Sequence, residues 1–107
     1  MPTKQRFKIV YDANVFKQLA SIERRYYGLI ERTITQQLRH EPDLETRNRK
    51  PLLRPSVFGE AWELRFGPGN RFRVFYGIDA EVSEVHILAI GVKVGSRLFV
   101  GGEEFEL

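Results

Sequence analysis

The sequence predicts an α+β fold in which an antiparallel β-sheet carries a hairpin of two helices on one face. Three observations predict it. Residues 6–12 alternate apolar and polar side chains as a strand does, and residues 13–39 then carry apolar side chains at helical spacing. Residues 61–94 contain three more strand-like segments joined by short connections, which favours an antiparallel meander. The length of 107 residues suits a single domain spanning 1–107.

The N-terminal part predicts one strand and two helices. Phe7, Ile9 and Tyr11 occupy alternate positions, which is typical of a strand with one buried face. Asp12 or Asn14 can cap the helix that follows, and a longer second helix runs from residue 23 to about residue 39. Neither helix would stay folded alone in water, so we expect both to pack on the sheet. Their apolar residues are Val15, Phe16, Leu19, Ala20 and Ile22, then Tyr26, Tyr27, Ile30, Ile34 and Leu38.

The C-terminal part predicts three sequential strands, over residues 61–66, 71–79 and 84–94. The third strand is nearly all apolar, which indicates a central strand buried on both faces. The second helix has to end near His40, because Pro42 cannot continue it. After the third strand, the tail SRLFVGGEEFEL forms either an extra strand or a mobile end.

The composition is that of an ordinary folded domain, with 42% hydrophobic and 29% charged residues. The chain has no cysteine, which excludes disulfides and thiolate metal sites and favours a reducing compartment. The start of the chain has no apolar segment of signal-peptide length, and the longest apolar run is too short to cross a bilayer. We therefore expect a cytoplasmic protein with no membrane association.

Charge is segregated along the chain. Residues 1–73 carry 15 Lys and Arg against 8 Asp and Glu, whereas residues 74–107 carry 2 against 6. A basic body favours a polyanion such as nucleic acid, or an acidic protein, as the partner. A basic surface that is simply solvated fits the net charge of +3 as well, so both interpretations stay open.

The connector between the second helix and the meander is also basic. Residues 46–55, with the sequence TRNRKPLLRP, place four basic side chains among prolines: Arg47, Arg49, Lys50 and Arg54. Loops made rigid in this way often present side chains to ligands. The alternative is a solvated linker, because basic loops are common.

Three arginines surround the predicted hairpin turn GPGN. Shifting the pairing of two strands by one residue moves every side chain of one strand to the other face of the sheet. Only pairings that put the apolar side chains of both strands on the same face can therefore bury them together. Such registers, with turns of three residues, place Arg65, Arg71 and Arg73 together opposite the core, with Glu63 the only acid near them on these strands. Opposed like charges are unfavourable, and guanidinium groups chelate phosphate, so this cluster calls for an external phosphate. The alternative is arginine stems lying over apolar surface with their charged heads in water.

The histidines offer little for catalysis. His40 lies at a helix end, and His86 lies in the last strand on the same side as Leu88 and Ile90, so we interpret both as structural. There is no cysteine, no histidine pair at helical spacing and no cluster of carboxylates. We therefore expect no metal site and no small-molecule cofactor.

The order of elements, together with the segments WELRFGPGNRFRVFYGI and VHILAIGVKVG, resembles the RelE/ParE superfamily of toxins from bacterial type II toxin–antitoxin systems. The resemblance covers about residues 6–98 and is closer to the RelE branch. It implies a RelE-like sheet with the helical hairpin on one face and a concave basic face open. In the RelE branch that face binds and cuts mRNA in the ribosomal A site. In the ParE branch the same fold inhibits DNA gyrase and does not cut RNA, and a cognate antitoxin neutralises either type.

The resemblance also implies site residues. Arg65 before the turn, Arg73 after it and Lys93 at the end of the last strand match basic positions of the RelE-type site and are the expected catalytic residues. Arg49 and Lys50 stand for the basic pair of the connector. The residues expected to bind RNA are Arg47, Arg49, Lys50, Arg54, Arg71 and Phe99.

The sequence departs from the family pattern in its tail. Phe99 stands where the family's catalytic tyrosine would lie, and phenylalanine can stack on a base but cannot donate a proton. The acidic end EEFEL suggests a hypothesis in which Glu103, Glu104 and Glu106 fold onto the arginines and occupy them before RNA does. The alternative is a solvated tail.

The leading interpretation is a type II toxin that acts as a ribosome-dependent, metal-independent mRNA endoribonuclease, or mRNA interferase, and inhibits translation. Its expected partners are a cognate antitoxin, the ribosome and mRNA. One alternative is a non-catalytic ParE-like inhibitor of DNA gyrase. Another is a catalytically inactive member of the fold that only binds its antitoxin. Fold alone does not choose among these functions.

Overall fold

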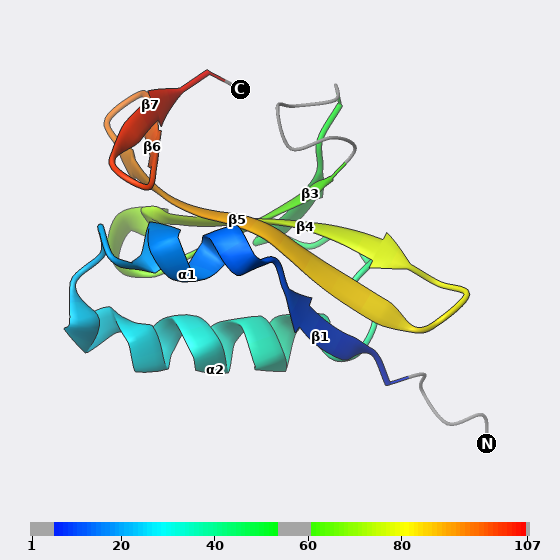
Figure 1. Cartoon of the computed structure of the whole chain (residues 1–107). Helices are drawn as coiled ribbons and strands as arrows, with labels where there is room; N and C mark the ends of the chain where they lie inside the picture. The colour runs from blue at the N-terminus through cyan, green and yellow to red at the C-terminus, as the bar shows by residue number, and fades with distance from the viewer. Residues whose placement is uncertain (1–5, 54–60, 107) are drawn as a thin grey trace.

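The computed structural model describes residues 6–53 and 61–106. Figure 1 shows the helix α2 on one side of a curved sheet, with the last two strands on the other side. The helical segments are α1 (Ala13–Leu19), the 3-10 turn η1 (Arg24–Tyr26), α2 (Tyr27–Leu38) and the 3-10 turn η2 (Pro68–Asn70). The strands are β1 (Lys8–Tyr11), β2 (Arg49–Pro51), β3 (Trp62–Phe66), β4 (Phe72–Asp79), β5 (Glu84–Val94), β6 (Arg97–Val100) and β7 (Glu103–Phe105).

The two α-helices form as the apolar spacing predicts. The Oδ1 atom of Asp12 accepts a hydrogen bond of 2.9 Å from the backbone N–H of Asn14 and so caps α1. In α2, Ile30, Ile34 and Leu38 recur every four residues and are buried against the sheet. In the part of the chain that the structure describes, no helix is long and apolar enough to cross a membrane.

The sheet is mostly antiparallel, with the order β2-β3-β4-β5-β6-β7. The remaining strand, β1, pairs with the first half of β5 in parallel, with Ile9 opposite Val85. β5 has 11 residues, so one of its edges pairs with β4 while the other pairs first with β1 and then with β6. The predicted α+β fold, with a helical hairpin and an antiparallel meander, is confirmed. The tail forms the two extra strands β6 and β7.

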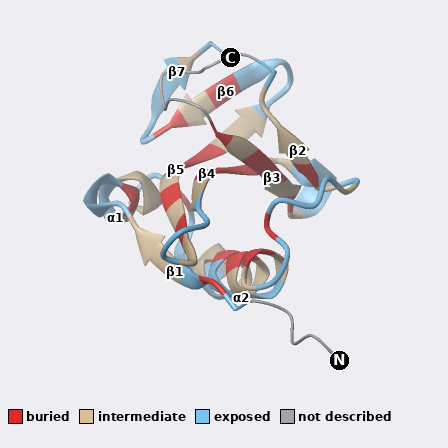
Figure 2. Cartoon of the chain, turned by 90° about the vertical axis from the view of Figure 1, so that its right-hand side faces the viewer, coloured by how far each residue is buried: buried red, intermediate tan, exposed pale blue. Residues whose placement is uncertain are grey.

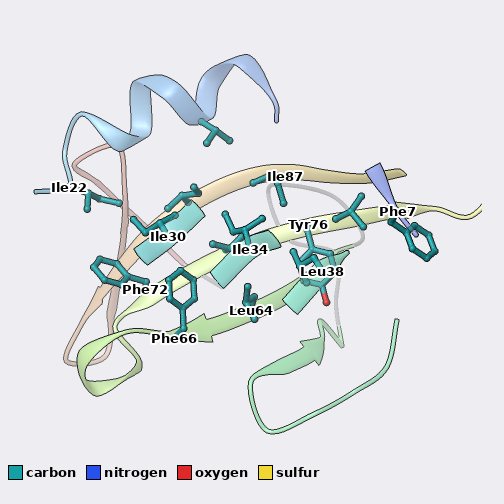
Figure 3. Packing of buried hydrophobic residues seen from close by; sticks show 14 residues of the cluster. Phe7, Ile22, Ile30, Ile34, Leu38, Leu64, Phe66, Phe72, Tyr76 and Ile87 are labelled. Atoms are coloured by element: carbon teal, nitrogen blue, oxygen red, sulfur yellow. The ribbon is translucent and has the colours of Figure 1, made fainter. Parts of the chain in front are cut away.

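The main core lies between the helices and the sheet. Figure 3 shows Leu64 of β3 with Phe72 and Tyr76 of β4, packed under Ile34 and Leu38 of α2. Buried residues concentrate on β3, β4, β5 and the inner side of α2 (Figure 2). The apolar faces predicted for β3 and β4 are therefore the faces that the helices cover.

The turn between β3 and β4 is longer than predicted. Phe66 lies opposite Phe72, so five residues connect the two strands, where three had been expected. Gly67 has a φ of 83°, and a Cβ atom at this position would lie 2.3 Å from Cδ2 of Phe72, so only glycine fits. Arg71 directly follows the 3-10 turn η2 and has helical backbone angles, so it is not part of the strand. β4 begins at Phe72.

A smaller apolar cluster covers part of the opposite face of the sheet. Phe75 and Ala89 are buried there under Leu98 and Val100 of β6. Two partly buried residues pack against this cluster, Leu52 after β2 and Phe105 of β7. The hairpin of β6 and β7 therefore folds back over the sheet on the side away from α2, as Figure 1 shows.

Candidate nucleic-acid interface

Toward the β3–β4 turn, the register of the sheet places five charged residues on the side away from α2. Lys50 lies opposite Glu63, Arg65 lies opposite Arg73, and Lys93 lies opposite the buried Leu98 of the smaller cluster. Directly opposed residues share a face of the sheet, and so do residues two apart on a strand. We call this surface the arginine face, and its charged residues are Lys50, Glu63, Arg65, Arg73 and Lys93.

At the centre of the arginine face, Glu63 joins the two arginines. The Oε1 atom of Glu63 accepts a hydrogen bond from Nε of Arg65 and another, of 3.2 Å, from Nη1 of Arg73. A third hydrogen bond runs from Nε of Arg73 to the carbonyl of Asn70, at 3.0 Å. The side chains of Glu63 and Arg73 are 2% and 8% exposed, whereas that of Arg65 is 42% exposed. Arg65 is therefore the guanidinium that a ligand can reach, and Arg73 lies beneath it.

The burial of Arg73 and the charges beside it determine the direction in which its pKa shifts. Desolvation lowers the pKa of Arg73 from its usual value, Glu63 opposes that shift, and Arg65 adds to it. Because Glu63 accepts from both guanidinium groups, the arginines already have a counter-ion within the protein. The expectation that their repulsion needs an external anion is therefore wrong, although two guanidinium groups and one carboxylate still leave a net positive charge.

Asn48, just before β2, fixes the backbone of Arg65. The amide N–H of Arg65 donates to the carbonyl of Asn48 at 2.8 Å, and Nδ2 of Asn48 donates to the carbonyl of Arg65 at 2.8 Å. These two bonds extend the pairing of β2 with β3 by one residue toward the turn. The basic connector therefore also contributes the uncharged amide side chain of Asn48 to the site, and the pattern of basic residues in the sequence does not indicate it.

The two lysines of the arginine face lie toward opposite edges of the sheet. Nζ of Lys50 pairs with Glu45 at 3.2 Å, and the Lys50 side chain remains 43% exposed. The backbone N–H of Lys93 donates to the carbonyl of Arg71 at 2.7 Å, which holds this part of β5 against the hairpin turn. The Lys93 side chain is partly buried. The positive charge thus runs across the sheet from β2 to β5.

Arg71 does not lie with Arg65 and Arg73, and that part of the predicted cluster is wrong. Its guanidinium carbon lies 4.7 Å from the ring centroid of Tyr26 and 5.0 Å from that of Phe72. Nη2 of Arg71 also lies 3.6 Å from Oε1 of Glu23. The longer turn causes this difference, because it turns Arg71 toward the helical side of the sheet.

Arg49 also lies on the helical side. It is opposite Leu64, and its side chain is buried. Nη1 of Arg49 donates to the carbonyls of Gln37 and Glu41, at 2.6 and 3.0 Å. These carbonyls belong to the last turn of α2 and the residues after it, where helices leave acceptors unpaired. The structure therefore uses Arg49 to close the end of α2, and it does not place this residue beside Lys50 on the arginine face.

The other residues expected to bind RNA are dispersed. Arg47 is exposed, just before β2, and Arg54 lies outside the described residues. Phe99 lies opposite Val92 and lines a cavity on the helical side together with Arg71. The structure therefore separates Phe99 from the arginine pair by the thickness of the sheet. A role in stacking a base beside Arg65 has no support in this geometry.

Histidine and tyrosine are not beside the arginine pair. Phe75 pairs with Ala89 but Tyr76 pairs with Ile87, so β5 has one extra residue there. This bulge puts His86 on the opposite face from Ile90, which corrects the expectation that they share one. Nε2 of His86 pairs with Oε1 of Glu84 at 3.1 Å. His86 lies opposite Gly77, which is four residues, or about 13 Å, along β4 from Arg73. All four tyrosines of the sequence belong to or pack against the main core: Tyr11, Tyr26, Tyr27 and Tyr76.

No group of three or more histidine, cysteine, aspartate or glutamate side chains that could hold a metal ion occurs in residues 6–53 and 61–106. The arginine face carries four cationic side chains that can bind an anion: Lys50, Arg65, Arg73 and Lys93. Such a surface suits a phosphodiester chain, because guanidinium and ammonium groups bind phosphate oxygens without a metal.

Comparison with known proteins supports the fold. The chain is similar to a chain of the crystal structure of the toxin–antitoxin complex RelBE2 from Mycobacterium tuberculosis. The TM-score is 0.68 with 22% sequence identity, and the likeness covers 87% of this chain and 98% of that chain. No family model and no curated protein matches the sequence. At this identity the likeness shows a RelE-like fold, as the sequence predicts.

Proposed function

We propose that this protein is the toxin of a type II toxin–antitoxin system, and that it cuts mRNA on the ribosome without a metal ion. The observation that carries the proposal is the arginine pair, in which the exposed Arg65 is backed by the buried Arg73. The pair lies on the face of a RelE-like sheet that α2 leaves uncovered. A phosphate bound there would lie on a surface that remains net positive.

In the proposed reaction, a ribose 2′-hydroxyl attacks the adjacent phosphorus and loses its proton to solvent water. The O2′–P bond forms and the P–O5′ bond breaks, which leaves a 2′,3′-cyclic phosphate and a departing 5′-oxygen that takes up a proton. The phosphorane that forms carries more negative charge than the ground state, so fixed cations stabilise it selectively. Arg65 would contact the non-bridging oxygens, and Arg73 would add its positive potential from below. Lys50, and Arg47 near the start of β2, would hold neighbouring phosphates.

Proton donation falls to the lysines in this proposal. The arginine pair has no tyrosine or histidine beside it, and an arginine is too weak an acid to supply a proton near neutral pH. Lys93 lies on the arginine face at the end of β5. We assign two roles to Lys93: it binds the neighbouring phosphate, and it donates the proton that the departing 5′-oxygen requires.

A second candidate function is inhibition of DNA gyrase without RNA cleavage. The observation that favours it is the position of all four tyrosines in or against the main core, which leaves the arginine face without an aromatic hydroxyl. A surface that binds but does not cut needs no proton donor. The same cationic residues would then contact an acidic surface of the enzyme or its DNA.

We also propose a cognate antitoxin as the partner. A groove of about 740 Å³ lies on the helical side, between β1 and the two helices. Its apolar lining includes Phe16, whose side chain is exposed, and its charged lining is three basic residues, Arg6, Lys8 and Arg39, with one acidic residue, Glu31. An amphipathic segment with acidic residues at its margins would fit such a groove. The RelBE2 structure is that of a complex with an antitoxin, which agrees with this proposal.

The experiment that tests the proposed activity is cell-free translation with mapping of mRNA 5′ ends by primer extension. The unaltered protein should produce new ends with codon periodicity only when ribosomes are present. Arg65→Ala should reduce the cleavage rate by about 100-fold or more, which is the usual effect of removing one charge-stabilising donor. Arg97→Ala is the matched control, because Arg97 is 71% exposed and pairs with Glu104 in the β6–β7 hairpin.

A supercoiling assay with purified gyrase separates the two candidates. The endoribonuclease proposal requires normal supercoiling alongside cleaved mRNA. Inhibited supercoiling with intact mRNA would contradict it and support the second candidate. Full cleavage by Arg65→Ala would show that the arginine face is not the active site.

A further inference from the structure

Glu63 is buried beneath two guanidinium groups, and the four other charged residues of the arginine face are cations. Its side chain is 2% exposed, and it is the second residue of β3, which lies between β2 and β4. Burial of a carboxylate costs free energy unless it is paired and hydrogen-bonded. Here Arg65 and Arg73 provide both conditions.

The position of Glu63 follows from strand geometry. Arg65 and Arg73 are direct cross-strand neighbours, so their charges repel if nothing lies between them. Glu63 precedes Arg65 by two residues, which puts the three side chains on one face. A single oxygen, Oε1, accepts from both guanidinium groups, so the carboxylate fixes the spacing between them.

The bonds to Glu63 also determine which side of each guanidinium is available. Arg65 uses its Nε atom toward Glu63, and the edge formed by its two Nη groups lies outside this hydrogen bond. Arg73 is held at two points, Nη1 to Glu63 and Nε to Asn70. Arg65 is thereby aimed outward and Arg73 is fixed underneath it.

We propose that Glu63 is a positioning residue, which holds Arg65 and Arg73 side by side and limits the charge of the pair so that Arg65 chelates one phosphate of an RNA strand. This inference rests on the proposed function only in naming RNA as the ligand. Glu63 does not contact the substrate. It acts through the two arginines, and it makes the surface less attractive to RNA than the arginines alone would be.

The first test uses the unaltered protein and needs no ligand. Side-chain N–H signals of the arginines are recorded by NMR on ¹⁵N-labelled protein at low temperature. Arg73 should show separate, slowly exchanging Nη signals, because Glu63 and Asn70 hold its guanidinium at two points. The exposed Arg97 serves as the internal comparison. Averaged, rapidly exchanging signals for Arg73, like those of Arg97, would overturn the proposal.

The second test measures binding of fluorescein-labelled decauridylate by anisotropy at several KCl concentrations. Glu63→Gln removes one negative charge beneath the arginines, so the variant should bind more tightly in low salt. Its affinity should also fall more steeply with salt. Between about 50 and about 200 mM KCl it should lose about threefold more affinity than the unaltered protein, as expected for one more neutralised phosphate on a single strand.

Glu81→Gln is the matched control for that substitution. It removes the same charge from an exposed position in the turn between β4 and β5, at the end of the sheet remote from the arginine pair. Its salt dependence should stay close to that of the unaltered protein. Equal slopes for Glu63→Gln and Glu81→Gln would overturn the proposal, because the charge of Glu63 would then not act on the site.

The two tests separate this inference from the proposed function. If Glu63→Gln does not fold, the NMR measurement on the unaltered protein decides the inference by itself. If the unaltered protein binds no decauridylate, the proposal of RNA as the ligand fails, and the NMR measurement again decides whether Glu63 orders the arginines. If RNA binds but no mRNA is cut, the endoribonuclease proposal fails while the role of Glu63 is still judged by the salt dependence.

Discussion

A buried guanidinium needs acceptors, and Arg49 and Arg73 obtain them in different ways. Arg49 donates to two backbone carbonyls at the end of α2, whereas Arg73 donates to the carboxylate of Glu63 and to one backbone carbonyl. Only Arg73 lies next to an exposed guanidinium, that of Arg65. The same residue type therefore closes a helix at one position and supports a candidate binding site at the other.

Tyr76 provides a prediction at the scale of one residue. Its hydroxyl is buried and donates to the carbonyl of Pro42 at 2.7 Å. Burial raises the pKa of Tyr76 well above its usual value, Arg49 opposes this shift, and Asp43 adds to it. Above about pH 10 the unfolded chain loses this proton and the folded protein keeps it, so the free energy of unfolding should fall as pH rises.

The measurement is urea denaturation of the unaltered protein and of Tyr76→Phe between neutral pH and about pH 11. From about pH 10 to about pH 11, the unaltered protein should lose about 1 kcal/mol more than the variant. At neutral pH, Tyr76→Phe should cost about 1 kcal/mol, because the Pro42 carbonyl loses its donor. Parallel pH profiles would show that the hydroxyl ionises equally in both states.

At the scale of elements, the short strand β2 links α2 to the arginine face. Its first residue, Arg49, closes α2 on one side of the sheet, and its second residue, Lys50, lies opposite Glu63 on the other side. The period of two in a strand separates these neighbours. The basic pair of the connector thus serves two different faces.

The burial of Arg49 predicts that it differs in its effects from the exposed Arg47, two residues earlier. Arg49→Ala should lower the free energy of unfolding by about 3 kcal/mol, because two charge-assisted hydrogen bonds to backbone carbonyls are lost. Arg47→Ala should change it by no more than about 0.5 kcal/mol, because Arg47 is exposed. Urea denaturation measures both values.

RNA binding completes that comparison. Arg47→Ala should weaken decauridylate binding and reduce its salt dependence, as expected for a phosphate contact. Folded Arg49→Ala should bind RNA as the unaltered protein does. Weaker binding by Arg49→Ala at unchanged stability would contradict the assignment of Arg49 to the end of α2.

The alternation of apolar and polar residues predicted which faces of β3 and β4 are buried. It did not predict where the strands depart from that alternation. Leu64 and Val74 lie on the helical face as expected, since apolar side chains repeat every two residues. Arg71 and His86 broke the pattern, one at a turn and the other beyond a bulge. Turn length and bulges depend on packing between strands, which periodicity does not record.

At the scale of the whole molecule, the acidic tail folds over the side of the sheet that carries the arginine pair. Phe105 of β7 packs against the cluster that contains Phe75, two residues from Arg73. The ion pairs of the described residues nevertheless join Glu104 to Arg97 at 3.4 Å, and join Arg65 and Arg73 to Glu63. The structure therefore gives the arginines a partner from β3, whereas the hypothesis gave them one from the tail.

These ion pairs predict a weak, salt-sensitive effect of the tail on RNA binding. Changing Glu103, Glu104 and Glu106 together to glutamine raises the formal net charge from +3 to +6. Binding of decauridylate should tighten in low salt and return to the unaltered value near physiological salt, where charges more than about 8 Å apart are screened. A large gain in affinity that persists at physiological salt would revive the hypothesis of an occluding tail.

The sequence by itself determined the α+β class, the helical hairpin, the apolar faces of the meander and the basic character of the body, because each depends on local periodicity or composition. It also marked Arg65 and Arg73 as one pair. Only the tertiary structure decided that Glu63 neutralises part of that pair, that Arg49 closes α2, and that Arg71 and Phe99 lie on the helical side. These outcomes depend on contacts between segments far apart in the chain, and the pattern of any one segment does not contain them.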